Sequence, residues 1–177
     1  MATKRLFFAL WPTAEITQSI KQNTDQIKKS ISGKFVASSN WHITLAFLGN
    51  IDSKTRACLI EQANKIKCSP FSIKFNNILY FKNPKILCYG LNKNSDTKDL
   101  NLLVQACKEI QNKCGLQSET RQYLPHITIV RKVKNPEREC KINPISWQVT
   151  EFVLVSSELS EKGSVYTVLN RWPLTLK

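Results

Sequence analysis

The sequence predicts an α+β fold, in which antiparallel sheets carry helices packed on one face. Three observations predict it. Two pairs of strand-like segments follow one another directly, three amphipathic helical segments lie between the other strands, and two similar strands lie 84 residues apart, close to half of the 177-residue chain. Strands joined by short connections pair in antiparallel fashion, whereas strict alternation of strand and helix would favour a parallel sheet. A chain of this length can bury roughly 70% of the surface that it exposes when unfolded, which suffices for one domain.

The individual elements follow from hydrophobic periodicity and from turn residues. Apolar, β-prone segments predict strands at residues 4–10, 41–48, 71–81, 85–91 and 126–130. Helical spacing of apolar residues predicts helices at residues 13–31, 53–66 and 96–114, the first ending before Gly33 and the third at Gly115. Gly49 and Asn50 are expected to end the strand 41–48. Residues 148–156 and 164–170 are expected to form a terminal hairpin with its loop closing at Gly163.

The charge balance is strongly basic, with 26 Lys and Arg against 13 Asp and Glu, a formal net charge of +13. A field of this sign attracts polyanions, and RNA, DNA and anionic membrane surfaces are the usual candidates. The alternative is a solvated, lysine-rich surface without such a partner. No segment approaches the ~20 apolar residues of a membrane span, and the apolar run Leu6–Trp11 is too short for a signal peptide. The protein is therefore expected to be cytoplasmic, with no membrane partner.

Six cysteines are present, but none forms a C-x-x-C pair and neither histidine lies at zinc-finger spacing from two of them. Reduced thiols are therefore expected rather than disulfides or zinc. Cys107 and Cys114 lie seven residues apart in a helical pattern and are expected to be core residues.

The only two histidines occur in nearly identical motifs, HITL at His42 and HITI at His126. Because side chains alternate along a strand, His42 and Thr44 share one face while Ile43 points to the other. The same alternation pairs His126 with Thr128. If the two strands lie side by side, two imidazoles and two hydroxyls meet in one site. One histidine on a strand is more often structural than catalytic, so the repetition carries this prediction.

Such a site suits the cleavage of a phosphodiester. A base must deprotonate the attacking oxygen, and an acid must protonate the leaving oxygen. Histidine can take either role because its pKa of ~6.5 lies near neutral pH. Threonine hydroxyls can donate to the non-bridging phosphoryl oxygens. This chemistry needs no metal and no cofactor, and we expect neither.

The two H-x-T-x sequences resemble the tandem motifs of the two-histidine (2H) phosphoesterase superfamily. Their surroundings resemble its bacterial RNA 2′,3′-cyclic phosphodiesterase branch, also called 2′-5′ RNA ligase or LigT-like; the matching stretches are RLFFAL, WHITLAFLG, RQYLPHITIVR and YTVLNRWPL. They run from Arg5 to Leu174. The resemblance implies a two-lobed, pseudo-twofold arrangement of small antiparallel sheets flanked by helices. It also implies an active-site cleft between the lobes and one bilobal domain over residues 1–177.

The resemblance further implies a role for each site residue. His42 would be the proton donor to the leaving ribose oxygen, and His126 the proton acceptor from water. Thr44 and Thr128 would hold the phosphate oxygens. Arg131 matches an arginine that often closes the second motif and would contact phosphate, or else form a salt bridge at the strand end. The family's reaction opens a 2′,3′-cyclic phosphate to a 2′-phosphate, and its reversal joins RNA ends through a 2′-5′ bond.

The implied partner is RNA or an oligonucleotide with a 2′,3′-cyclic phosphate end, and the chain is expected to act as a monomer. Trp41, Phe47 and Tyr123 could stack on a base or belong to the core, and Arg121 could line the cleft or lie in a solvated loop. Three alternative functions stay open. They are a phosphodiesterase for 2′-5′ oligonucleotides or small cyclic nucleotides, a non-catalytic RNA- or nucleotide-binding module, and, on charge alone, a DNA-binding protein.

Overall fold

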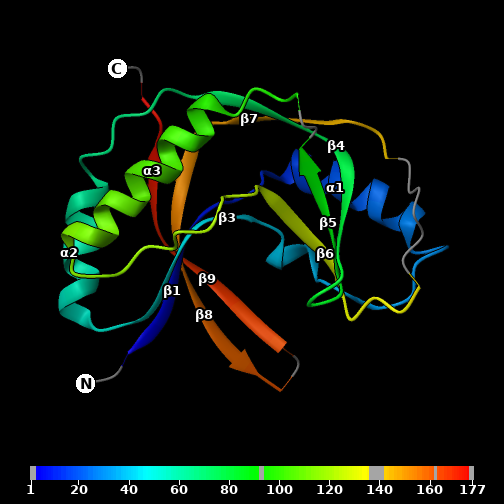
Figure 1. Ribbon diagram of the computed structural model, residues 1–177, viewed down its shortest axis with the longest axis horizontal. Helices are drawn as coiled ribbons and strands as arrows, with labels where there is room; N and C mark the ends of the chain where they lie inside the picture. The colour runs from blue at the N-terminus through cyan, green and yellow to red at the C-terminus, as the bar shows by residue number, and fades with distance from the viewer. Residues whose placement is uncertain (1–2, 92–93, 136–141, 162, 176–177) are drawn as a thin grey trace.

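The computed structural model describes residues 3–91, 94–135, 142–161 and 163–175 (Figure 1). The helices are α1 (Ala14–Ile27), α2 (Ser53–Ala63) and α3 (Lys98–Lys113), with a short 3₁₀ turn, η1 (Ser38–Asn40). The strands are β1 (Lys4–Leu10), β2 (Lys34–Phe35), β3 (Ile43–Ile51), β4 (Phe71–Phe81), β5 (Ile86–Leu91), β6 (His126–Arg131), β7 (Ile145–Val149), β8 (Glu151–Ser160) and β9 (Gly163–Pro173). The predicted α+β class is confirmed.

The nine strands of the described residues form one antiparallel sheet in the order β7-β4-β5-β6-β3-β1-β8-β9, and β2 pairs with β6. The sheet has two halves. Strands β3, β1, β8 and β9 form one half, and β6, β5, β4 and β7 form the other. A single residue pair, Ile43 with Ile127, joins the halves through β3 and β6. The two small sheets implied by the resemblance are therefore the two halves of one curled sheet (Figure 1).

The two halves share a repeated unit of strand, helix and strand. The first unit is β1-α1-β3 and the second is β5-α3-β6. Each helix crosses to the opposite half. Thr24 of α1 shares a hydrogen bond of 3.2 Å with the Tyr89 hydroxyl on β5, while Gln111 of α3 donates to the Phe47 carbonyl on β3 at 2.7 Å. These buried side chains keep their hydrogen bonds, so each helix is fixed in register against the other half's strands.

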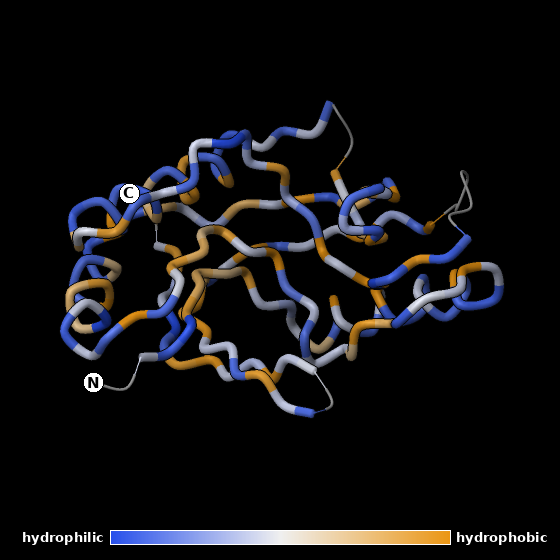
Figure 2. The backbone as a smooth tube through the Cα atoms, turned by 60° about the horizontal axis from the view of Figure 1, so that its bottom comes forward, coloured by the Kyte–Doolittle hydropathy of each residue, from blue (hydrophilic) through white to orange (hydrophobic). Residues whose placement is uncertain are grey.

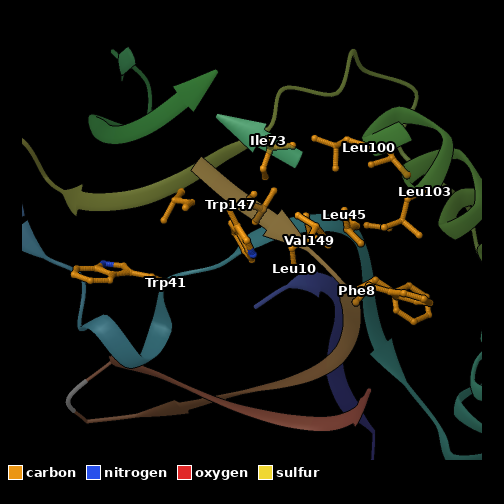
Figure 3. Packing of buried hydrophobic residues seen from close by; sticks show 14 of the residues in the cluster. Phe8, Leu10, Trp41, Leu45, Ile73, Leu100, Leu103, Trp147 and Val149 are labelled. Carbon is orange, nitrogen blue, oxygen red and sulfur yellow. The ribbon is translucent and has the colours of Figure 1, made fainter. Parts of the chain in front are cut away.

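The core lies between the helices and one face of the sheet, and both halves contribute to it. Figure 3 shows Leu10 of β1 next to Val149 of β7, and Phe8, Trp147 and Leu100 belong to the same buried cluster. Figure 2 shows the apolar residues concentrated on the central strands and the polar ones on the loops. A shared core explains why the halves hold together although only one strand pair joins them.

The predicted strand end at Gly49 and Asn50 is wrong, because β3 continues to Ile51. The pairing of β1 with β3 shifts register at this point, with Leu6 opposite Gly49 and Phe7 opposite Phe47. Gly49 has φ 81°, a left-handed conformation that glycine adopts without steric cost. A glycine that predicts a turn is here part of a β-bulge inside the strand.

The predicted terminal hairpin is confirmed as β8 and β9, but its first strand begins later than expected. Gln148 belongs to the separate strand β7, which pairs with β4, and the chain leaves the sheet at Thr150 before β8 begins. Strands β7 and β8 are both apolar and only one residue separates them, so periodicity does not distinguish them. The two-residue strand β2 was not predicted, because its length gives no periodic signal.

The expectation of reduced thiols is wrong for one pair of cysteines. Cys58 of α2 and Cys114, at the end of α3, form a disulfide across a sequence separation of 56 residues. Their pairing depends on the packing of two helices, which spacing along the sequence does not reveal. Cys107 is buried as expected, whereas Cys114 is only partly buried, and Cys140 lies outside the described residues.

Candidate active site

The pairing of β3 with β6 brings both histidine motifs together. Ile43 and Ile127 are partners in this pair and both are fully buried, so their neighbours project from the opposite face. In an antiparallel register this sets His42 opposite Thr128, and Thr44 opposite His126. Directly opposed side chains have Cβ atoms about 4.5–5.5 Å apart. Each imidazole therefore lies across from the hydroxyl of the other motif, all four side chains being half-buried.

Both imidazoles are oriented by the same backbone contact. His42 Nδ1 donates to the Asn40 carbonyl at 2.7 Å, and His126 Nδ1 donates to the Leu124 carbonyl at 2.8 Å. A carbonyl can only accept, so Nδ1 carries the proton in each ring. In the neutral form Nε2 is then the acceptor nitrogen and the one available for proton transfer; in His42 it accepts a hydrogen bond from the Thr44 hydroxyl at 3.1 Å.

His42 lies among aromatic rings. Trp11 stacks on it at 5.6 Å between centroids, Phe7 lies at 4.9 Å, and Tyr166 meets it edge-on at 5.2 Å. This burial lowers the pKa of His42 to about 4, with smaller contributions in the same direction from the charges of His126 and Arg131. The Asn40 carbonyl opposes the shift because it stabilises the charged ring. The free site therefore holds His42 in its neutral form at pH 7.

His126 has a different neighbourhood. The Phe81 ring of β4 lies 5.6 Å from it at a tilt of 56°. Its partner across the pair of β5 with β6 is Gly90. A Cβ at Gly90 would lie 2.3 Å from the Leu79 side chain, so Leu79 occupies the space beside this position. One aromatic ring therefore lies near His126, with Leu79 packed over its register partner Gly90, whereas three aromatic rings surround His42.

The two threonines also differ in their contacts. Thr44 Oγ1 lies 3.1 Å from His42 Nε2, and the Tyr123 hydroxyl donates to the Thr44 carbonyl at 3.1 Å. Thr128 Oγ1 accepts a weak hydrogen bond from the Cys88 thiol at 3.6 Å. Burial raises the pKa of Cys88 to about 11, so this sulfur keeps its proton and stays a donor. With Cys88 donating, the Thr128 hydroxyl hydrogen is free to point toward an anion.

Both motif strands carry a bulge directly after the threonine. The register skips Leu45 on β3 and Ile129 on β6. The extra residue shifts the alternation by one, so that the third residue after each threonine returns to the face that carries the histidines and threonines. That residue is Phe47 in the first motif and Arg131 in the second; Phe47 is 47% exposed, and Arg131 is exposed too.

Among the described residues Arg131 forms no ion pair, so the salt bridge considered for it from the sequence is not seen there. Its charge acts on both His42 and Cys88, which places the guanidinium near the two motifs.

Three other residues considered from the sequence fall outside this face. Trp41 is 3% exposed and belongs to the core, which leaves it no surface for stacking on a base (Figure 3). Tyr123 is half-buried and uses its hydroxyl to hold the β3 backbone; burial raises its pKa. Arg121 is exposed and pairs with Glu119 at 2.8 Å, as expected of a solvated loop.

Four residues that border the two motifs were not predicted from the sequence: Phe7, Trp11, Tyr166 and Cys88. They come from β1, the segment after it, β9 and β5, and none has a motif of its own. The only available signal was indirect, because the stretches RLFFAL and YTVLNRWPL that carry Phe7 and Tyr166 stood out with the family's pattern. Their place around His42 depends on the pairing of β1 with β3 and of β1 with β8.

Among the described residues, no three His, Cys, Asp or Glu side chains gather in a way that could hold a metal ion. None of the described helices combines the length and the apolar character needed to cross a membrane.

The curled sheet, with an imidazole and a hydroxyl from each of two paired strands, defines a site of the two-histidine phosphoesterase type. Comparison with known proteins agrees. The sequence profile of the family described as "LigT like Phosphoesterase" matches residues 10–88. The chain is 30% identical to the RNA 2′,3′-cyclic phosphodiesterase of Methanocaldococcus jannaschii, covering 95% of this chain and 99% of that protein. It is 28% identical to the Escherichia coli protein of the same name, with 97% of each covered.

Solved structures extend the likeness to the fold. The crystal structure of E. coli LigT complexed with 3′-AMP superposes with a TM-score of 0.89 at 28% identity, covering 98% of this chain and 99% of that one. The chain belongs to the LigT-like phosphoesterase family.

Proposed function

We propose that the protein is a phosphodiesterase that hydrolyses RNA 2′,3′-cyclic phosphate ends to 2′-phosphates. Its relatives of this name align over nearly their whole length with this chain. The observation that carries the proposal is the pairing of Ile43 with Ile127, which sets an imidazole and a hydroxyl from each motif on one face. Two histidines and two hydroxyls on one face suit acid–base chemistry on a small anion.

The proposed step is an in-line displacement at phosphorus. His126 Nε2 accepts a proton from water, and the water oxygen forms a new bond to phosphorus. The bond to the ribose 3′ oxygen breaks, and His42 Nε2 gives that oxygen a proton. Thr44, Thr128 and Arg131 bind the non-bridging oxygens, which carry the negative charge. The product is a 2′-phosphate with a free 3′ hydroxyl.

The lowered pKa of His42 sets a condition on this mechanism. A proton donor must be charged, yet the buried ring is neutral at pH 7 in the free site. A bound phosphate supplies a negative charge beside the ring and pairs with Arg131, whose own charge otherwise lowers the pKa of His42. Substrate binding therefore raises the pKa of His42 and charges the ring only when there is a leaving group to protonate.

The same lowered pKa supports a second assignment, with His42 as the base and His126 as the acid. A ring that is neutral at pH 7 is ready to accept a proton without any change on binding. The two assignments use the same residues on the same substrate and differ in which histidine the leaving oxygen meets. An activated leaving group separates them experimentally, as described in the Discussion.

The direct test is product analysis on an RNA that ends in a 2′,3′-cyclic phosphate. Wild-type protein should produce a 2′-phosphate end without added metal, and His42→Ala and His126→Ala should each lose turnover by at least about 10²-fold while remaining folded. Circular dichroism and thermal unfolding would confirm the fold of each variant. Full activity in either variant would exclude the proposal, and binding of the RNA without conversion by wild type would favour a non-catalytic module.

Finer points belong to the same proposal. Ligation of RNA ends through a 2′-5′ bond would reverse the reaction, with a 5′ hydroxyl in place of water. Offering the protein a 2′-5′ linked dinucleotide beside the cyclic substrate would tell which direction it supports. A monomeric state and a cytoplasmic location stay predictions from the sequence.

A further inference from the structure

We infer that lysines around the end of β6 form a binding surface for the RNA strand that leads to the reacting end. This lysine surface consists of Lys34, Lys82, Lys85, Lys132 and Lys134. It rests on the proposed function, because it binds the part of the substrate that lies beyond the terminal nucleotide. A 2′,3′-cyclic phosphate closes the 3′ end of an RNA, so this part is the chain on its 5′ side.

The backbone gathers these lysines from three separate segments. Lys34 on β2 is the register partner of Arg131 on β6, and Ile86, the residue after Lys85, pairs with Arg131 from the other side. The amide of Val133 donates to the Lys85 carbonyl at 3.1 Å. The turn from β4 to β5 and the segment after β6 therefore lie side by side, at the same end of the sheet (Figure 1).

The charges of the lysine surface are not neutralised by the described residues. All five lysines are exposed, and none takes part in any of the ion pairs found in the described part of the chain. By contrast, Lys28 and Lys65, which follow the ends of the helices α1 and α2, each pair with an acidic neighbour. Lysines grouped in this way attract a chain of phosphates, and each phosphate bound releases counterions.

Two members of the surface have an unusual backbone. Lys85 has φ 57° and Lys132 has φ 53°, and they are the only residues other than glycine with positive φ in the described chain. This left-handed region is costly for a residue with a Cβ, and asparagine, aspartate or glycine is the usual occupant. Both positions instead carry a lysine, and both adjoin the end of β6. We take a lysine at both positions as support for a role of positive charge at these turns.

The lysine surface is continuous with the active site. Arg131 belongs to the proposed phosphate site and stands between Lys34 and Ile86 in the register. Lys34 Nζ lies 3.8 Å from the point where a side chain at Gly163 would begin, so it reaches the tip of the β8–β9 hairpin. An RNA strand that leaves the site past Arg131 thus meets further cations at once.

The test compares a short and a long substrate with one charge-matched pair of variants. The surface variant carries Lys82→Gln, Lys85→Gln and Lys132→Gln, and Arg131 is left intact. The control variant carries Lys54→Gln, Lys67→Gln and Lys74→Gln, three exposed lysines outside any described ion pair and away from the end of β6. The substrates are 2′,3′-cyclic AMP and an oligoadenylate of about twelve nucleotides that ends in a 2′,3′-cyclic phosphate.

The surface variant should raise the KM for the oligonucleotide at least about tenfold at low salt, because three phosphate contacts are lost. Its slope of log(kcat/KM) against log salt should become shallower by about 2 for the same reason. Turnover of 2′,3′-cyclic AMP by the surface variant should stay within about twofold of the wild-type value, since no lysine of the surface enters the proposed chemistry. Equal effects on both substrates, or the same loss in the control variant, would overturn the inference.

A failure of the proposed function has a different signature. If wild type converts neither substrate, the surface can still be measured by fluorescence anisotropy with an oligoadenylate that ends in a 2′-phosphate. Weaker binding by the surface variant than by the control variant would support the surface without any catalysis. Equal binding by both variants would reject it.

Discussion

The two motif strands carry the same H-x-T-x motif, and each histidine Nδ1 donates to a backbone carbonyl, yet the surroundings of the two histidines differ. Three aromatic rings surround His42, and its burial lowers its pKa to about 4, whereas one aromatic ring lies near His126. The third position after the threonine holds Phe47 in one motif and Arg131 in the other. A repeated unit thus produces equivalent positions, and the side chains packed around them make the positions unequal. A reaction that needs one acid and one base requires such a difference.

The largest expected effect concerns the roles of the two histidines. A phosphodiester with a p-nitrophenolate leaving group needs no proton donor, because the departing oxygen is already a stable anion. If His42 is the acid, His42→Ala should lose about 10²–10⁴-fold on a cyclic RNA end but little on the activated ester. His126→Ala should lose activity on both substrates. Steady-state kinetics on the two substrates measures this.

The opposite pattern would reverse the roles. If His126→Ala is the variant that the activated ester rescues, His42 is the base, in keeping with its lowered pKa in the free site. If both variants lose the same activity on both substrates, the two rings do not have separate roles as acid and base.

A large part of this site could be predicted from the sequence, because a strand alternates its side chains and the motif occurs twice. His42, Thr44, His126 and Thr128 therefore share one face, as expected. The bulges at Leu45 and Ile129 could not be predicted, since they arise from how each strand pairs with its neighbour. The aromatic surroundings of His42 could not be predicted either, because Phe7, Trp11 and Tyr166 converge on it only in three dimensions.

The fold shows the same division. Periodicity predicted the long elements, whose signals extend over several turns or several alternations. It failed where one residue decides, as at Gly49, which lies in a bulge, and at Thr150, which separates β7 from β8. The Cys58–Cys114 disulfide depends on a helix–helix contact and has no local signal.

The next effect compares the two threonines. Thr44→Val and Thr128→Val each remove one hydroxyl donor to the phosphate, and each should lower kcat by about 10²-fold. The loss at Thr128 should be partly reproduced by Cys88→Ala, because without the thiol donor the Thr128 hydroxyl is free to turn away. Steady-state kinetics on the cyclic RNA end measures kcat and KM for each variant.

Cys88→Ser supplies the control for this prediction. Serine keeps a donor at this position and should restore activity toward the wild-type value, whereas a purely structural role of Cys88 would leave the serine and alanine variants equally active. Wild-type activity in both threonine variants would remove them from the phosphate site.

Substitutions at the equivalent positions Phe47 and Arg131 should differ in how strongly they lower kcat/KM. Arg131→Gln removes a cation from the phosphate site and should lower kcat/KM by about tenfold or more on 2′,3′-cyclic AMP and on RNA alike. Phe47→Leu removes an exposed ring and keeps apolar bulk, so it should have a smaller effect. Kinetics with both substrates measures this, and a larger loss at Phe47 than at Arg131 would reverse the assignment of the phosphate contact.

The smallest expected effect separates the two histidines through folding stability. The pKa of His42 is about 4 when folded and about 6.5 when unfolded, so between these values the unfolded chain binds a proton that the folded chain does not. Acid therefore favours unfolding, and wild type should lose about 1 kcal/mol from this ring between pH 7.5 and pH 5.5. His42→Gln cannot bind that proton and should lose correspondingly less. Urea unfolding at both pH values measures the difference, in which the groups common to both proteins cancel. If both proteins lose the same free energy of unfolding between the two pH values, the aromatic rings do not hold His42 neutral. The unequal environments of the two motifs would then affect catalysis by a route other than the pKa of His42.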